Sequence, residues 1–170
     1  MPSLILLALL GCVSQTDGTY KVTLTVNGQE CVEDDNLDVN TDEQVYNGLM
    51  SVYHTTNDTL VMKYLSVIMT GSEEKRTFSV SHTEGWTDVS CGVSSFNSTY
   101  AFDGEFGADL GMVGTMTITE EDKLENCSSV PDTNSVCTTT VGISGIRLNS
   151  KPDAHALNSQ GWGYIPNFGY

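Results

Sequence analysis

The sequence has few basic residues. It contains 7 Lys and Arg against 22 Asp and Glu, which gives a formal net charge of −15, and no Lys or Arg occurs before Lys21. A surface with this charge repels the phosphates of nucleic acids and of anionic lipid head groups. We therefore expect no nucleic-acid partner.

The marks of common catalytic chemistries are also absent. The sequence contains no GxSxG, HExxH, GxGxxG, CxxCH or P-loop motif, and no CxxC pair. Its three histidines, His54, His82 and His155, share no metal-ligand spacing. His82 alternates with apolar residues, which is more typical of a packed core residue than of a ligand. The sequence thus predicts no cofactor, no metal centre and no enzyme activity.

Its N-terminal apolar run is short. Leu4 to Leu10 is uninterrupted but far below the roughly 20 residues that a membrane span needs. Its length fits the h-region of an export signal, although the usual basic n-region is missing. We expect residues 1–11 to be a signal peptide and the mature chain to be exported.

The end of this run and the two residues after it, Leu9-Leu10-Gly11-Cys12, resemble the lipobox of bacterial lipoproteins. The resemblance, to an uncharacterised lipoprotein with a small secreted β domain, implies that Cys12 is lipidated and that residues 12–18 are a tether. Because Val13 rather than Asp follows the cysteine, it also implies retention in an outer membrane, so the membrane is a partner through the N-terminal lipid. The alternative is ordinary signal-peptidase cleavage near Ser14, which would release a secreted protein.

Four further cysteines fit an exported chain. Cys31, Cys91, Cys127 and Cys137 are an even number, which predicts two disulfides in an oxidising compartment. Three connectivities are open. We favour Cys127 with Cys137, because they close a short loop, and hence Cys31 with Cys91.

Residues 19–148 show the alternation of polar and apolar side chains that is typical of half-buried strands. The predicted class is all-β: an antiparallel β-sandwich or a meander barrel of about eight or nine strands. The strands expected from this pattern cover residues 19–26, 45–54, 60–69, 77–83, 88–93, 98–106, 111–119 and 138–148.

Several turns are predicted between these strands. Asn27-Gly28 favours a hairpin in which residues 29–32 pair back. Residues 71–75 and 120–123 are polar and are interpreted as turns. Residues 60–69 are the most apolar run of the mature chain and are interpreted as one strand buried on both faces.

Two acidic patterns are candidate sites. Asp38, Asn40 and Asp42 have the alternating oxygens of a calcium loop, but Glu43 stands where such a loop needs glycine, which favours a solvated loop. Asp103 and Glu105 lie two residues apart on one strand and so point to the same face, as a pair of glycosidase carboxylates would. Solvent-facing acids are the preferred interpretation there too.

The C-terminal segment, residues 149–170, is rich in glycine and aromatic residues. Trp162, Tyr164, Phe168 and Tyr170 occupy even positions, so an extended tail presents their rings on one side. Docking against the domain, contact with a carbohydrate or partner, and the closing strand of an outer-membrane barrel are the alternatives, and Pro166 argues against the last. If the source is eukaryotic, the sequons at Asn57 and Asn97 are candidate glycosylation sites in predicted turns.

Taken together, the sequence predicts an extracytoplasmic, lipid-anchored β domain that binds an unknown protein or glycan, or has a structural role in the envelope. The alternatives are a secreted glycoprotein and a carbohydrate-active or carbohydrate-binding protein.

Overall fold

The structure, a computed structural model, describes residues 16–33, 36–129 and 131–152. The signal peptide, Cys12 and the aromatic tail from residue 153 lie outside the described residues. The described part of the chain includes no helix with the length and hydropathy of a membrane span.

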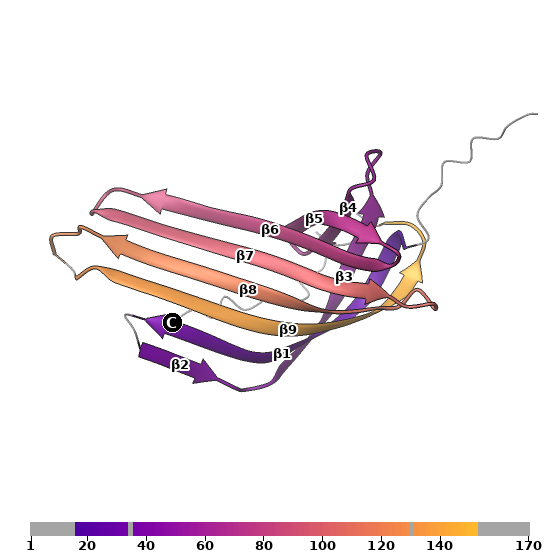
Figure 1. The fold of residues 1–170 in the computed structure, drawn as a ribbon, viewed down its shortest axis with the longest axis horizontal. Coiled ribbons are helices and arrows are strands. Elements are labelled where there is room, and N and C mark those ends of the chain that lie inside the picture. The colour runs from indigo at the N-terminus through magenta and orange to yellow at the C-terminus, as the bar shows by residue number, and fades with distance from the viewer. Residues whose placement is uncertain (1–15, 34–35, 130, 153–170) are drawn as a thin grey trace, which may run out of the picture.

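The described residues form nine antiparallel strands (Figure 1). Their bounds are β1 Gly18–Glu33, β2 Asn36–Asn40, β3 Gln44–His54, β4 Leu60–Tyr64, β5 Val67–Glu74, β6 Thr77–Asp88, β7 Val93–Phe106, β8 Met112–Glu125 and β9 Thr133–Asn149. Each strand from β3 to β9 pairs with the next, and β9 pairs with β1 to close an eight-stranded barrel. The all-β prediction is confirmed, and of its two alternatives the barrel is correct.

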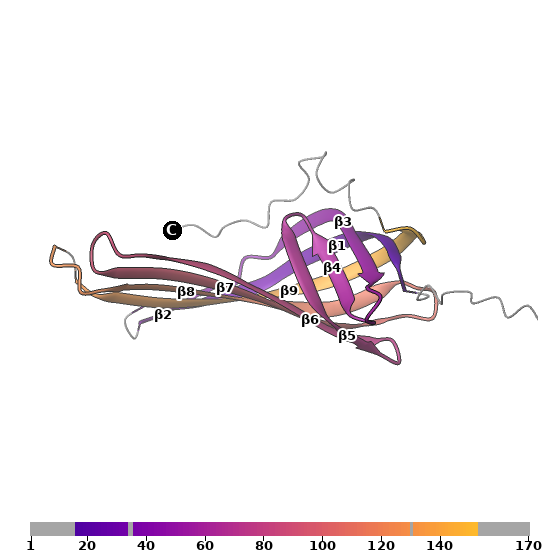
Figure 2. The same cartoon turned by 90° about the horizontal axis from the view of Figure 1, so that it is seen from above.

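The long strands continue beyond the barrel as a single sheet (Figures 1 and 2). β1 pairs with β3 up to Val26 and with β2 from Gln29, so β2 and β3 occupy successive parts of the same edge of β1. β6 pairs with β5 only up to Ser81, and beyond that point it pairs only with β7. We call this part the sheet extension; it comprises residues 29–33, 36–40, 82–88, 93–100, 118–125 and 133–139.

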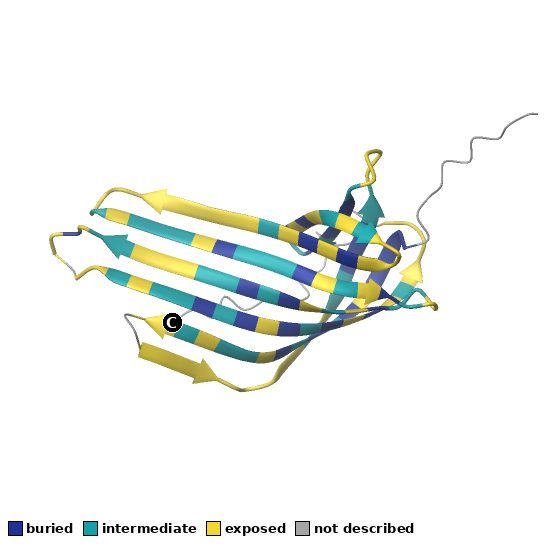
Figure 3. Cartoon of the chain, in the orientation of Figure 1, coloured by how far each residue is buried: buried dark blue, intermediate teal, exposed yellow. Residues whose placement is uncertain are grey.

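The hydrophobic core lies in the barrel and reaches only the base of the sheet extension, where Ile118 belongs to it and Tyr100 packs against it. Alternate side chains of the barrel strands point inward, and most are completely buried, among them Tyr20, Val22, Met50, Val52, Met62, Phe78, Phe102 and Ile143. Figure 3 shows these buried positions concentrated in the barrel, whereas the strands of the extension are mostly half-buried or exposed. Stability from apolar burial therefore comes from the barrel.

Two glycines allow the aromatic core to pack against the barrel wall. Gly104 and Gly114 lie opposite each other on β7 and β8. A Cβ atom on Gly104 would come within 2.6 Å of Cζ of Phe78, whose ring packs edge-on against that of Phe102 with centroids 4.8 Å apart. The missing side chains thus leave the space that the two rings occupy.

Two turn predictions are wrong, and a third is displaced. No hairpin forms at Asn27-Gly28; β1 runs on to Glu33 with a bulge between Val26 and Gly28. Residues 120–123 lie within β8, and 71–74 within β5, because a strand exposed to solvent accommodates consecutive polar residues. The turn expected at 71–75 is displaced to Lys75 and Arg76, which join β5 to β6. Polarity alone therefore did not mark a turn in this chain.

Two strand predictions are also corrected. Residues 60–69 form β4 and β5, and the turn between them places Leu65 at φ 54°, a conformation that glycine or asparagine usually signals. Residues 88–93 are mainly the connection from β6 to β7 rather than a strand. The strands expected at 19–26, 45–54, 77–83, 98–106 and 138–148 are confirmed within longer elements.

The cysteines form two disulfides, with a pairing different from the expected one. Cys31 bonds to Cys137 across β1 and β9, and Cys91 bonds to Cys127 between the β6–β7 and β8–β9 connections. The prediction failed because closure of the barrel makes the first and last strands neighbours, which short-loop reasoning does not foresee. Disulfides hint at an oxidising, extracytoplasmic environment.

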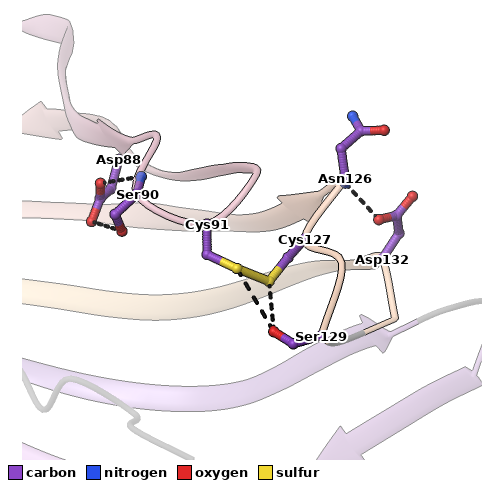
Figure 4. The surroundings of a disulfide bond; sticks show 7 residues. All are labelled: Asp88, Ser90, Cys91, Asn126, Cys127, Ser129 and Asp132. Atoms are coloured by element: carbon purple, nitrogen blue, oxygen red, sulfur yellow. Dashed lines mark hydrogen bonds between the residues drawn. A yellow bond between two sulfur atoms is a disulfide. The ribbon is translucent and has the colours of Figure 1, made fainter.

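Both disulfides lie in or at the tip of the sheet extension. Around Cys91–Cys127, Ser129 Oγ lies 3.4 Å from Cys127 Sγ, and the Asn126 amide donates to Asp132 at 2.7 Å (Figure 4). Asp88 accepts hydrogen bonds from the Ser90 amide and hydroxyl at the end of β6. Covalent bonds and turn hydrogen bonds thus fix the part of the molecule that has no core of its own.

Candidate functional site

The sheet extension has two different faces. Because side chains alternate along a strand, the inner face continues the barrel interior and the outer face continues the barrel exterior. The register aligns one inner row across six strands: Glu84, Ser98, Glu120, Cys137, Cys31 and Asp38. The Cys31–Cys137 disulfide therefore lies beside Glu120 in the same row.

The inner face of the extension is acidic. By register it carries Glu33, Asp38, Glu84, Asp88, Glu120 and Asp122. Among the described residues it carries no Lys or Arg: the lysine of the extension, Lys123, is on the outer face and lies 2.8 Å from Glu125. This face consequently has a negative potential that the structure itself does not neutralise.

Aromatic side chains lie among these acids. Trp86 and Phe96 are opposite each other on β6 and β7, and Tyr100 follows Phe96 by four residues on the same face. Trp86 is 54% exposed, whereas Phe96 and Tyr100 are half-buried. Acids beside accessible rings are the combination that organic cations prefer.

Four residues surround the buried Ser98 where the barrel opens onto the extension. Ser98 lies between Glu84 and Glu120 across the strands, and between Phe96 and Tyr100 along its own strand. We call these five residues the Ser98 frame. Strand spacing separates the Cα atoms of the two glutamates by about 10 Å. Ser98 is 1% exposed because the larger neighbours close over it.

Polar contacts connect the members of the Ser98 frame. The Tyr100 hydroxyl donates to Glu84 Oε1 at 3.4 Å, and His82 Nε2 lies 3.7 Å from Glu84 Oε2. The Ser98 hydroxyl lies near enough to the Tyr100 phenol to lower its pKa, but makes no hydrogen bond of ordinary geometry with the described residues. A buried hydroxyl without such a bond is rare in folded proteins.

Burial changes the acidity of two groups here. Desolvation raises the pKa of Tyr100; Ser98 opposes this change, and the charges of Glu84 and Glu120 add to it. Desolvation also raises the pKa of Glu120, because half-burial disfavours its charged form. A cation bound next to Glu120 would reduce that cost.

The opposite end of the barrel is closed by a buried polar cluster. His54 Nδ1 lies 2.7 Å from Asp17 Oδ1, and its Nε2 lies 3.5 Å from Glu73 Oε2. Thr16 Oγ1 donates to Glu73 at 2.6 Å, and Arg147 donates to the Asp17 carbonyl. Both ring nitrogens of His54 therefore face carboxylates. Hydrogen bonds and ion pairs among its own residues hold the cluster together, and we call it the polar plug.

Tyr20 joins this plug to the core. Its hydroxyl donates to the Thr16 carbonyl at 2.7 Å, and burial raises the pKa of Tyr20 to about 12, with Arg147 opposing the change. Sequence reasoning did not identify the plug, because its residues come from β1, β3, β5, β9 and the segment before β1. Only closure of the barrel brings them together.

The predicted carboxylate pair lies elsewhere. Asp103 and Glu105 are exposed on the outer face of β7, as expected, and line a shallow hollow of about 790 Å³ with Ser79 and Thr115. The aromatic residue in its lining, Phe78, is 1% exposed and offers no ring surface. Neither acid contacts the Ser98 frame, which is on the other face.

The calcium candidates do not converge on one centre. Asp38 and Asn40 belong to β2, and the Asn40 side-chain oxygen accepts a hydrogen bond from the Asp42 amide at 2.9 Å. Within the described ranges, no three His, Cys, Asp or Glu residues are placed to hold a metal ion together.

The remaining sequence candidates are placed as follows. Asn57 is exposed in the turn between β3 and β4, as predicted, whereas Asn97 is exposed within β7 and not in a turn. His82 faces inward but is only half-buried, with its side chain 30% exposed. Cys12 and the ring-bearing Trp162, Tyr164, Phe168 and Tyr170 lie outside the described residues.

One space within the barrel core, lined by described residues, is too small for a ligand. Leu24, Met50, Tyr64 and Met116 surround this space, which is too small for a water molecule. A binding role therefore has better support on the surface of the molecule than in its interior.

Comparison with known proteins supplies no family. No model of a protein family matches the chain, and no curated sequence matches it significantly.

Proposed function

We propose that this protein is a lipid-anchored, extracytoplasmic binding module that has no catalytic role and uses its sheet extension to contact a partner. The single observation that carries the proposal is the extension itself. It adds two exposed faces and two open edges to a barrel that already has a complete core. Open edges and exposed apolar side chains are liabilities unless something binds them.

Both disulfides support this role for the extension. They fix strands and connections that bury few apolar side chains, so the shape of this surface is maintained by covalent bonds. Rigid surfaces lose less conformational entropy when they bind. Attachment rests on the lipobox-like Leu9-Leu10-Gly11-Cys12, which would place the extension on a tether at a membrane.

Site-specific photo-cross-linking in the native host tests the binding role. A photoreactive phenylalanine replaces Trp86 on the extension or, as a matched control, Val113 on the barrel exterior; their exposures are 54% and 53%. We expect a discrete adduct of one reproducible mass from position 86 and none from position 113. Adducts from both positions, or from neither, would contradict a binding role for the extension.

The anchor has its own test. Intact-mass analysis of membrane-purified protein should show a mature N-terminus at Cys12 that carries acyl chains, and a Cys12→Ala variant should leave the membrane fraction. A free N-terminus near Ser14 would instead make the protein secreted.

A second candidate function, carbohydrate binding or hydrolysis, is favoured by one observation. Asp103 and Glu105 share an open hollow of about 790 Å³ on the barrel exterior. Replacing both by Asn and Gln should abolish binding or turnover on a glycan array if this function is correct. Unchanged signals, or no signal in either protein, would remove it.

A further inference from the structure

The inner face of the sheet extension specifies the chemistry of its partner more closely than the fold does. The face carries six acids and no described Lys or Arg, so charge complementarity selects a cationic partner. The question is which cation fits, and where on the face it binds.

The Ser98 frame is the one place on this face where acids, rings and a buried polar group coincide. Glu84 and Glu120 lie on opposite sides of Ser98, and both are accessible: the Glu84 side chain is 55% exposed and Glu120 is half-exposed. Phe96 and Tyr100 flank Ser98 along β7. The Ser98 hydroxyl, 1% exposed, adds a buried group that lacks a hydrogen bond of ordinary geometry.

These features match a guanidinium group better than an ammonium group or a metal ion. A guanidinium is planar, donates in two directions to carboxylates on either side and stacks on aromatic rings. An ammonium is a compact point charge, and a divalent cation would need oxygen ligands converging within about 2.6 Å. Glu84 lies on β6 and Glu120 on β8, with β7 between them, and this separation suits a broad, flat cation.

We propose that the Ser98 frame binds the guanidinium group of an arginine on an extracytoplasmic partner protein. This inference rests on the proposed binding function and names the chemistry that the extension recognises. In the free protein, the Tyr100 hydroxyl and His82 contact Glu84. The arginine takes the position between Glu84 and Glu120, and its charge offsets the cost of the half-buried Glu120 carboxylate.

The test uses three blocked nonapeptides of alternating serine with arginine, lysine or citrulline. Citrulline keeps the shape of arginine but has no charge. Each is titrated into the full chain, oxidised and isotope-labelled, and binding is followed by NMR. We expect the arginine peptide to bind about tenfold more tightly than the citrulline peptide, and more tightly than the lysine peptide. The largest shifts should map to the Ser98 frame.

A matched pair of variants separates the frame from general charge attraction. Glu84→Gln with Glu120→Gln should weaken arginine-peptide binding about tenfold or more. Glu30→Gln with Glu121→Gln removes the same charge from the outer face of the sheet extension, on β1 and β8, and should change the affinity for the arginine peptide less than about twofold. Both pairs lie in exposed or half-exposed positions, so both should fold.

Three results would overturn the inference: equal losses in both variant pairs, equal binding of the citrulline or lysine peptide, or shifts that map outside the frame. Failure here is distinguishable from failure of the proposed function. A cross-link from position 86 together with no preference for arginine keeps the binding module and rejects the guanidinium. No cross-link from position 86 rejects the module whatever the peptides do.

Discussion

Closure of the barrel determines the burial and the contacts of individual residues in this protein. Tyr20 is fully buried, and its hydroxyl links the apolar core to the polar plug through the Thr16 carbonyl. Glu120 is half-buried at the other opening, beside the Cys31–Cys137 disulfide. Both groups therefore have pKa values above their ordinary ones, and both make the free energy of unfolding depend on pH.

Tyr20 predicts a loss of stability at alkaline pH. Its pKa of about 12 in the folded state exceeds the ordinary value near 10, so folding favours the protonated form. The stabilisation is complete below about pH 10 and is lost as the pH rises towards 12. Urea unfolding at pH 7 and pH 11 should show a smaller alkaline loss for Tyr20→Phe than for the wild type. At pH 7 the variant should be about 1 kcal/mol less stable, because it lacks the hydrogen bond. Equal alkaline losses in both proteins would contradict this role.

Substitution of Glu120 should raise the free energy of unfolding at pH 7, whereas substitution of Tyr20 lowers it. Because burial raises its pKa, its contribution to stability is complete at acidic pH and decreases as the pH rises through the folded-state pKa. At pH 7 the half-buried carboxylate of Glu120 lowers the free energy of unfolding of the wild type, because desolvation disfavours its charged form. Glu120→Gln should therefore be more stable than the wild type at pH 7, and the difference should vanish near pH 3. The exposed neighbour Glu121→Gln is the control and should differ from the wild type by less than about 0.5 kcal/mol. A destabilised Glu120→Gln at pH 7 would show that the carboxylate is held by favourable contacts.

At the scale of elements, the strands divide into segments with two different sources of stability. Within the barrel, alternating side chains pack against each other across a closed cylinder. In the extension, the same strands lose that second layer, and disulfides replace it. A sheet of this kind without a packed face is only marginally stable in water.

Removal of one disulfide should measure its contribution. Cys91 and Cys127 are 36 residues apart in sequence, and a loop of that size corresponds to about 4 kcal/mol in the chain-entropy treatment. Cys91→Ser with Cys127→Ser should lower the free energy of unfolding in urea by about 2–4 kcal/mol. Wild-type protein treated with reductant is the control and should fall at least as far, since it loses both bonds. A loss below about 0.5 kcal/mol would show that the tip is held by other contacts.

Much of the strand content could be predicted from the sequence, because alternation reports directly which residues face a core. The alternation predicts strands in β1, β3, β7 and β9, and the solvent-facing positions of Asp103 and Glu105 on β7 are confirmed. The Leu65 turn could not be predicted, since a leucine at positive φ carries no sequence signal. Polar strand ends such as that of β8 resemble turns in the sequence, because they have no buried face to produce alternation.

The candidate site was less predictable than the strands. Asp103 and Glu105 were recognised as a pair because they are two residues apart on one strand. Glu84 and Glu120 are 36 positions apart, and they flank Ser98 only through the register of three strands. The disulfide pairing depends in the same way on β1 meeting β9. Long-range register is set by the whole barrel, and no local pattern in the sequence encodes it.

At the scale of the whole molecule, stability and recognition lie in different places. The barrel contains the core, and a polar plug closes one end. Beyond the other end, the extension is a single layer of strands (Figure 2). Its inner face is acidic. With a formal net charge of −15, the molecule repels copies of itself, which favours a cationic partner over self-association.

Hydrogen exchange on the full chain, oxidised and reduced, tests this division most directly. In the oxidised protein, amides of both parts should be protected. After reduction, amides in the extension, such as those of residues 93–97 and 121–125, should lose nearly all of their protection, while barrel amides around Val22, Met62 and Phe102 lose protection only as far as the global free energy of unfolding falls and stay protected. Uniform loss of protection in both parts, or no change in the extension, would contradict the account of a self-stable barrel that carries a disulfide-held binding surface.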